Sequence, residues 1–391
     1  MSQIPRKPMP EPLRARRLAE TDADAIAEFM RSAGWDANAT SDSVRGWLRT
    51  AAAHNPFEPG VGPPLVGVFI GSLLVACLSS IPTRFWNGRE FAAAHWLKGF
   101  WVLEQHRDGL IGFLLLKEML KHVGLAASMP AALGPRKLSV ALGMLDLGTV
   151  RNYIEPLRIA RILRKLDSRL LELNGVPKSA SIALKIAKIS PVAYAVEALI
   201  ALGLAAARFP RILAMRALTM QLGERLPSES DLDSLWDRAR DAGSCCASRS
   251  AAYLRWRYEH GANGRYWFAS CWRQAQLVGL AVLQHPERLD DPRLAGLLIG
   301  SVVDLVLDPR CPDALPGVLG AARRWARSLN YDALLLTMSH LGLRGLVLRS
   351  GYVPMPGNIH LMLRDPGGKH GLSPNLDAWM VTRGDAWSDH L

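Results

Sequence analysis

The sequence has few cysteines, and those it has are poorly placed for cross-links or metal binding. Its 391 residues contain five cysteines, an odd number that includes the adjacent pair Cys245 and Cys246. This pattern excludes a disulfide framework and paired zinc ligands, and it indicates reduced thiols. The start, MSQIPRKPMPEPLRARR, is basic and proline-rich and lacks the apolar core of a secretory signal. We therefore expect a cytoplasmic protein.

Several catalytic signatures are also missing. The chain contains no HExxH, no GxSxG, no Walker loop and no cluster of histidine and cysteine. These absences argue against metalloproteases, α/β-hydrolases, nucleotide hydrolases and zinc enzymes, and we expect no metal cofactor. Basic and aromatic residues do not alternate as in an RNA-binding motif, so nucleic acid is not the expected partner.

Positive charge is abundant and unevenly placed. The formal net charge is +12, and the stretch 158–226 alone holds twelve basic residues against four acidic ones. Apolar residues recur there at helical spacing with Arg161, Arg164 and Lys165 between them, which predicts amphipathic helices with basic faces. Its most apolar run carries Glu197 at its centre and is too short to span a bilayer.

Two interpretations of this basic segment remain open. It is either a helical linker with solvated basic faces, or a docking surface for an acidic carrier protein or an anionic membrane surface. The second would make the protein peripheral to the membrane.

A repeated order of elements surrounds the basic segment. Before it, the pattern predicts a hairpin over 64–81, a long strand over 91–103, a helix over 110–123 and a strand over 137–142. After it, the pattern predicts a hairpin over 265–283, a strand over 301–309, a helix over 316–329, a strand over 331–338, a helix over 340–351 and a final strand over 352–363. We expect an α/β protein with two mixed-sheet domains, at 1–157 and 231–391, joined by a basic helical linker at 158–230.

The segment FWVLEQHRDGLIGFLLLKEML carries the clearest chemical signal. A strand ends, a loop turns, and a helix begins with unpaired backbone N–H groups and the positive end of its dipole facing the loop, which suits a phosphate. Gly109 and Gly112 leave the backbone approachable, and Arg107 offers charged hydrogen bonds. The alternative is a purely structural turn.

This unit, following a hairpin and a long strand, resembles the GNAT superfamily of N-acyltransferases, whose cofactor loop has the pattern R/Q-x-x-G-x-G/A. Arg107 matches the first position, Ile111 the apolar residue and Gly112 the last. The sequence departs from the pattern at Leu110, where the family has its first glycine, while Gly109 stands one residue earlier.

The resemblance implies a donor thioester on the phosphopantetheine of acyl-CoA or of an acyl-carrier protein. The arm would run beside the backbone of Trp101, Val102 and Leu103. The phosphates would meet the loop, whose residues are Arg107, Asp108, Gly109, Leu110, Ile111 and Gly112.

The second half resembles a GNAT domain as well, and Gly351 and Tyr352 match the family's closing G-[FY]. Its corresponding turn, LDPRCPDALPG, lacks the cofactor pattern and contains three prolines, which have no N–H to donate. We therefore expect a degenerate second copy that binds no cofactor.

N-acyl transfer needs a base for the ammonium substrate and an acid for the leaving thiolate. His95, on the long strand, is a candidate base, and its alternative role is a hydrogen-bonded core residue. Glu90 and Glu104, at the two ends of that strand, are further candidates that also fit as solvated charges. Tyr153 is a candidate acid, with packing against the linker as the alternative.

Asp304 lies in an apolar strand, where a buried carboxylate requires a partner, and we expect Arg255 or Arg257 to supply it. The sequence thus predicts a tandem-GNAT acyltransferase that moves an acyl group from a pantetheine thioester to a small-molecule amine. Two alternatives stay open: a Fem-type transferase using aminoacyl-tRNA, and a non-catalytic GNAT-fold scaffold that docks a partner or membrane.

Overall fold

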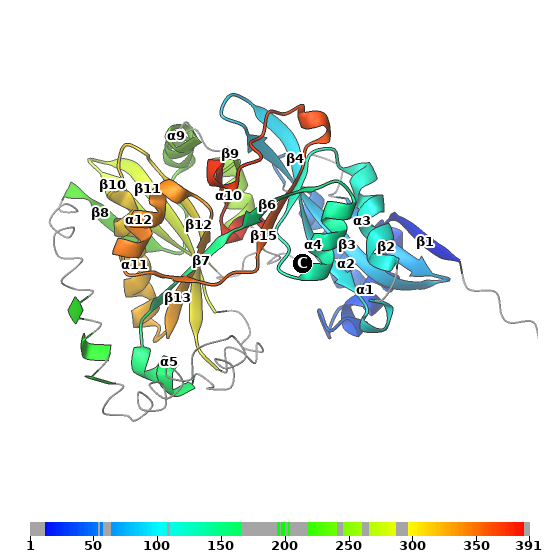
Figure 1. The fold of residues 1–391 in the computed structure, drawn as a ribbon, viewed down its shortest axis with the longest axis horizontal. Helices are drawn as coiled ribbons and strands as arrows, with labels where there is room; N and C mark the ends of the chain where they lie inside the picture. The colour runs from blue at the N-terminus through cyan, green and yellow to red at the C-terminus, as the bar shows by residue number, and fades with distance from the viewer. Residues whose placement is uncertain are drawn as a thin grey trace, which may run out of the picture.

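The protein consists of two sheet-containing halves that lie side by side (Figure 1). The computed structural model describes residues 12–53, 55–57, 64–107, 110–165, 194–195, 197–199, 202–203, 217–240, 245–259, 266–286 and 296–386.

The first sheet has the strand order β1-β2-β3-β4-β5-β15-β6. Its strands are β1 (Leu13–Arg17), β2 (Leu65–Ile70), β3 (Leu73–Trp86), β4 (Phe91–Val102), β5 (Ala126–Ser128), β6 (Leu145–Thr149) and β15 (His360–Arg364). The short strands β9 (Cys245–Ala247) and β16 (Trp379–Met380) extend it beside β3. Its helices are α1 (Ala23–Ser32), α2 (Ser41–Ala53), α3 (Ile111–His122) and α4 (Leu133–Ala141), and a 3-10 turn, η2 (Glu104–His106), follows β4.

The second sheet has the order β14-β7-β13-β12-β11-β10-β8. Its strands are β7 (Arg151–Pro156), β8 (Thr219–Gly223), β10 (Tyr266–Arg273), β11 (Gln276–Gln284), β12 (Ile299–Leu307), β13 (Ala333–Met338) and β14 (Val353–Met355). Its helices are α5 (Ile159–Lys165), α9 (Glu229–Arg240), α10 (Ala251–Tyr258), α11 (Ala314–Ser328), α12 (Leu341–Arg349) and α13 (Arg383–Ala386).

Helices cover both faces of the second sheet. Successive side chains of a strand point to opposite faces, so β11 contributes to two cores. Leu283 lies in the same core as Val318 and Trp325 of α11, whereas Leu280, three residues earlier, lies in the core on the other face with Leu235 of α9. Both sheets are mixed, because β4 pairs with β5, and β12 with β13, in parallel.

Each half contributes strands to the sheet of the other: besides the short β9 and β16, one longer strand crosses in each direction. β7, from the first half of the chain, lies between β13 and β14, and β15, from the second half, lies between β5 and β6. In Figure 1 the teal-green β7 therefore belongs to the yellow and orange half, and the orange-red β15 to the cyan half. The sequence pattern did not predict this exchange.

The predicted strand at 137–142 is wrong, because these residues lie mostly in helix α4. Leu138, Val140 and Leu142 alternate along the sequence, which suggested a strand. In the structure Leu138 and Leu142 are four residues apart on one helix face and pack against the core, while Val140 is exposed. The three-residue strand β5 takes the sheet position instead.

The predicted single strand at 352–363 is also wrong. It consists of β14 and β15, which belong to different sheets. The break falls at Pro356 and Gly357, and proline and glycine both interrupt strands. The chain crosses between the halves at this break.

A buried ion cluster joins the end of the chain to the second sheet. Arg249 is fully buried and contacts Asp304 at 2.8 Å and Asp385 at 2.7 Å. Thr382 donates from its hydroxyl to Asp304 at 2.9 Å, and Tyr258 donates to the same carboxylate at 2.9 Å. Asp304 therefore has the polar partners that its burial requires.

The expected partners of Asp304, Arg255 and Arg257, were the wrong arginines. Arg255 pairs with Glu259 of its own helix at 2.7 Å, and Arg257 donates to the carbonyl of Gly384. Arg249 comes from the loop before α10, so helical periodicity could not place it next to β12.

We expect Arg249→Met to lower the free energy of unfolding by about 3–5 kcal/mol, because it leaves two carboxylates buried without their shared cation. Urea unfolding monitored by tryptophan fluorescence measures the loss. Arg45→Met is the matched control: it removes an exposed pair with Asp42 on α2 and should cost less than about 1 kcal/mol. Equal losses in the two variants would contradict this account of the cluster.

Candidate functional site

A cleft opens in the first half where β4 and β5 separate. The two strands pair in parallel only from His95–Ala126 to Leu97–Ser128. Beyond Leu97, β4 continues to Val102 with β3 on one side and no described strand on the other. The resulting cleft has a volume of about 380 Å³. It is lined by Leu78, Leu97, Lys98, Gly99, Phe100, Trp101, Leu116, Ser128, Met129, Pro130, Ala131, Ala132, Pro135 and Ser139.

A β-bulge lies in the wall of this cleft. Ser79 pairs with Lys98 and Cys77 with Trp101, so Gly99 and Phe100 together face the single residue Leu78. Gly99 has a φ of +65°, a conformation that favours glycine. A bulge bends its strand and changes the direction of the backbone groups, here in the part of β4 that lines the cleft.

Helix α3 begins next to the cleft. Its N-cap residue, Leu110, makes no side-chain cap, and its side chain is 67% exposed. A Cβ at Gly112 would lie 2.9 Å from Leu138 and 3.2 Å from Phe100, so this glycine allows α3 to pack closely against α4 and β4. Ile111 is buried beneath it. None of the predicted cofactor residues Leu110, Ile111 and Gly112 lines the cleft itself; Gly112 lies against Phe100, which does, and Leu116, one turn later on α3, is also part of the lining.

Arg107 is exposed in the loop before α3, and its Nε donates to the carbonyl of Val102 at 3.4 Å. Asp108 and Gly109 lie outside the described residues. Arg107 therefore remains at the surface between the end of β4 and the start of α3, with most of its donors facing solvent.

The three predicted backbone partners of the pantetheine arm differ in their surroundings. Trp101 lines the cleft, and its ring stacks on Trp35 at 5.7 Å between centroids with the planes 9° apart. The carbonyl of Val102 accepts from Arg107, and the N–H of Leu103 donates to Val75 at 3.0 Å. The part of β4 whose backbone faces the cleft therefore ends before Leu103.

His95 is half-buried on β4, and its Nδ1 lies 3.2 Å from the hydroxyl of Ser80. Burial lowers its pKa from 6.5 to about 4. The ring is thus neutral at pH 7 and a weak base. It is not among the residues that line the cleft.

The other predicted catalytic residues lie apart from the cleft. Glu90 is exposed at the β3–β4 turn, where its N–H donates to Asn87. Glu104 is exposed in η2, after the end of β4. Tyr153 lies in β7 and is buried in the core of the second sheet. The structure therefore does not bring these three side chains together.

Lys98 is a cleft residue that the sequence analysis missed. It is among the residues that line the cleft, it is only 7% exposed, and its carbonyl accepts from Ser79 at 3.0 Å. A lysine inside an otherwise apolar strand, followed by glycine, was the available signal. The residues of α4 that line the cleft were missed because 137–142 was assigned to a strand.

The turn between β12 and α11 in the second half has different chemistry. The carboxylate of Asp308 is buried there and accepts from Arg238 at 2.6 Å, and Arg238 also donates to the carbonyl of Leu277 at 2.6 Å. A carboxylate of the protein itself thus occupies the turn that corresponds to the cofactor loop of the first half.

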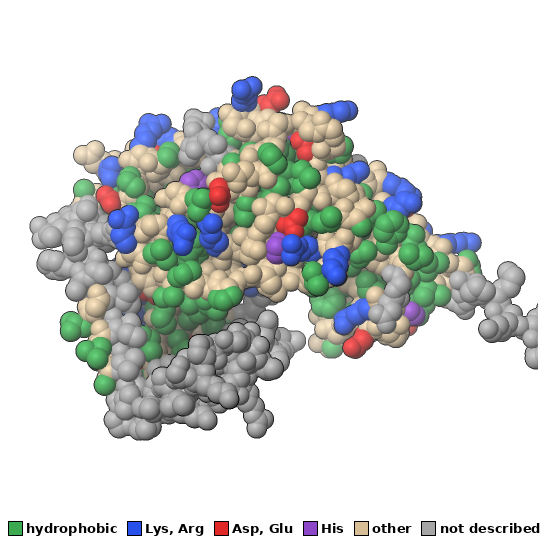
Figure 2. Space-filling view, viewed as in Figure 1, with side chains coloured by type: hydrophobic (Ala, Val, Ile, Leu, Met, Phe, Trp, Pro, Cys, Tyr) green, Lys and Arg blue, Asp and Glu red, His purple; other side chains and the backbone are tan. Residues whose placement is uncertain are grey.

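The basic segment is only partly described. Most of 158–226 lies outside the described residues, and the three basic residues singled out in α5 contact their own chain. Arg161 pairs with Asp332 at 3.3 Å, Arg164 lies over the ring of Tyr194, and Lys165 donates to the carbonyl of Gly296. Elsewhere, Lys and Arg side chains are spread across both halves of the face in Figure 2.

The five cysteines are buried and free of disulfides. No group of three or more histidine, cysteine, aspartate or glutamate side chains in the described ranges could hold a metal ion. No described helix combines the length and the apolar composition needed to cross a bilayer.

Comparison with known proteins identifies the fold. No model of a protein family matches the chain, and no curated protein matches it significantly. Among solved structures, Saccharomyces cerevisiae N-myristoyltransferase with bound myristoyl-CoA aligns with a TM-score of 0.55 at 14% identity, over 96% of this chain and 86% of that one.

Two bacterial structures are also similar. A probable N-acyltransferase from Enterococcus faecalis V583 has a TM-score of 0.55 at 9% identity, over 90% of this chain and 73% of that one. A GCN5-related N-acetyltransferase from Kribbella flavida has a TM-score of 0.51 at 14% identity, over 91% and 72%. The chain thus has the GNAT fold, and the prediction of an α/β protein with two mixed sheets is confirmed.

The environment of His95 gives a pH prediction. Because the folded protein holds the ring neutral, the unfolded chain binds the proton more strongly, and stability is lost as the pH falls from 6.5 to 4. The loss attributable to His95 is about 3 kcal/mol. His95→Gln, which cannot titrate, should give a flatter curve of unfolding free energy against pH in this window. Parallel curves for the two proteins would contradict the prediction.

Proposed function

We propose that this protein is an N-acyltransferase that moves an acyl group from a pantetheine thioester, carried by acyl-CoA or an acyl-carrier protein, to an amine. The observation that carries the proposal is the cleft where β4 leaves β5, with the bulge at Gly99 in its wall and Leu116 of α3 in its lining. The GNAT fold of the whole chain supports the same reading.

The shape of the cleft suits an extended pantetheine arm. Along Lys98–Val102, β4 exposes backbone groups to a cleft instead of to a neighbouring described strand. Backbone donors and acceptors require partners, and the amides of pantetheine can pair with them as a strand would. Phe100, Leu116 and Met129 offer apolar contacts for its methylene groups.

The start of α3 suits the phosphates of the donor. The first N–H groups of the helix have no partner within the helix, and Leu110 supplies no side-chain cap. The dipole favours negative charge at this end, and Arg107 stands exposed in the preceding loop. The donor would thus run from α3, beside its phosphates, to the bulge, beside its thioester.

The reaction itself is a direct displacement. The neutral amine nitrogen attacks the thioester carbonyl, a C–N bond forms and the C–S bond breaks. The proton that the nitrogen loses balances the one that the leaving thiolate takes up, so the products are an amide and a free thiol. Negative charge develops on the carbonyl oxygen and then on sulfur. Backbone N–H groups at the bulge are the groups of the cleft that would stabilise this charge.

We expect Arg107→Glu to weaken binding of acetyl-CoA and longer acyl-CoAs at least tenfold, because repulsion replaces a charged phosphate contact. Isothermal titration calorimetry measures the change. Arg89→Glu, at the exposed β3–β4 turn, reverses the same charge away from the cleft and should bind normally. Equal affinity of the Arg107→Glu and Arg89→Glu proteins would remove the cofactor-loop assignment.

Ala132→Trp tests the cleft separately from the loop. Ala132 is exposed and lines the cleft, so an indole there should fill the path of the pantetheine arm without disturbing the core. We expect loss of acyl-CoA binding in calorimetry while the urea midpoint stays within the error of the parent protein. Normal binding by this variant would show that the ligand lies elsewhere.

A further inference from the structure

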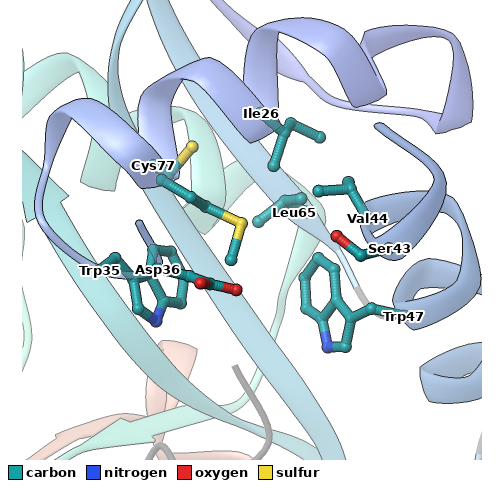
Figure 3. A pocket seen from close by; sticks show the side chains of 9 residues that line it. Ile26, Trp35, Asp36, Ser43, Val44, Trp47, Leu65 and Cys77 are labelled. Carbon is teal, nitrogen blue, oxygen red and sulfur yellow. The ribbon is translucent and has the colours of Figure 1, made fainter. Parts of the chain in front are cut away.

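A second cavity lies in the first half, between helices α1 and α2 and strands β2 and β3, and encloses about 180 Å³ (Figure 3). Its inner lining is apolar and includes the buried residues Ile26, Val44, Leu65 and Cys77. A water molecule takes roughly 30 Å³ in the liquid, and a methylene group is of similar size, so the cavity suits a hydrocarbon body of about six carbon atoms.

The outer part of the cavity has different chemistry. The indoles of Trp35 and Trp47 flank it, and in Figure 3 the carboxylate of Asp36 lies between them. Asp36 accepts from the N–H of Asn38 at 2.9 Å, and no basic side chain in the described ranges forms an ion pair with it. Both indoles are partly exposed, and Asp36 is exposed.

Together these groups favour a ligand that has a hydrocarbon part and carries a positive charge at one end. Indole rings attract cations through their faces, most strongly among the aromatic side chains, and a carboxylate adds a direct charge pair. A carboxylate or phosphate ligand would be repelled by Asp36. A neutral alkyl chain would fill the inner part and leave the carboxylate without a counter-charge.

The cavity is linked to the acyl-CoA cleft through one aromatic stack. Trp35 lines the cavity, Trp101 lines the cleft, and their rings stack at 5.7 Å. Cys77, in the cavity, is also the register partner of Trp101 on the neighbouring strand. A ligand in the cavity would thus contact Trp35, whose ring stacks on Trp101 of β4.

We infer that this cavity binds a small organic ammonium compound, with its hydrocarbon body among Ile26, Val44 and Leu65 and its cation between Trp35 and Trp47 against Asp36. The role of this ligand as acceptor amine rests on the proposed acyl transfer, whereas its binding does not. An ammonium compound is the acceptor that such a reaction consumes, after loss of one proton.

Calorimetry on the full chain without any acyl donor tests the binding. The probes are n-hexylammonium, 1-hexanol and hexanoate, which share one chain length and differ in charge. We expect n-hexylammonium to bind most tightly and hexanoate least. Asp36→Asn, which keeps the size of the side chain, should weaken n-hexylammonium about tenfold and leave 1-hexanol within twofold.

Asp42→Asn is the matched control, because Asp42 is an exposed carboxylate of α2 that does not line the cavity. Trp47→Leu should weaken n-hexylammonium more than 1-hexanol, since it removes the cation-binding ring and keeps an apolar wall. Equal affinity for n-hexylammonium and 1-hexanol, or an Asp36→Asn protein that binds as the Asp42→Asn protein does, would overturn the inference.

The two proposals can fail separately. If n-hexylammonium binds as expected but acyl-CoA does not respond to Arg107→Glu, the cavity assignment stands and the acyl-transfer proposal falls. If acyl-CoA binding depends on Arg107 but n-hexylammonium binding is unchanged by Asp36→Asn, the acyl-transfer proposal stands and the cavity assignment falls.

Discussion

The parallel pairing of β4 with β5 covers three residue pairs, and the candidate site depends on where it stops. A backbone without a neighbouring strand must find other partners, either water or a ligand. Had β5 continued, Lys98–Val102 would be covered and there would be no cleft. The bulge at Gly99 follows directly after Lys98, which still pairs with Ser79 of β3, so the regular ladder of β4 is interrupted beside the cleft.

The position of β5 depends in turn on the other half of the chain. β15 pairs with β5 on the side away from β4, so residues near the end of the sequence hold the strand that borders the cleft. The Arg249 cluster then fixes α13 against β12. Between β15 and α13, Trp379 of β16 packs edge-on against Phe85 of β3, which makes the same kind of contact with Trp96 of β4. The cleft is therefore built by both halves, although its lining residues come from the first.

Local signals were sufficient for the hairpins β2–β3 and β10–β11, for β4, and for α3, because each combines strong periodicity with clear turns. They failed where tertiary contacts decide. Leu138 and Val140 alternate like strand residues, yet their segment is helix α4, on which Leu138 packs against Gly112 of α3. The strand exchange, the cation for Asp304 and the cavity at Asp36 all join residues far apart in sequence, so no local pattern could predict them.

The second half shows that the fold alone does not make the site. β12, α11 and β13 repeat the arrangement of β4, α3 and β5, with a parallel pair connected through a helix. At the turn before α11, however, Asp308 occupies the space with a negative charge that Arg238 neutralises. At the turn before α3, Arg107 is exposed with most of its donors unused. Before α11, a phosphate would have to displace an existing ion pair. Before α3, it would supply an anion for Arg107. The chemistry therefore lies in the turn residues of one half and not in the architecture that both halves share.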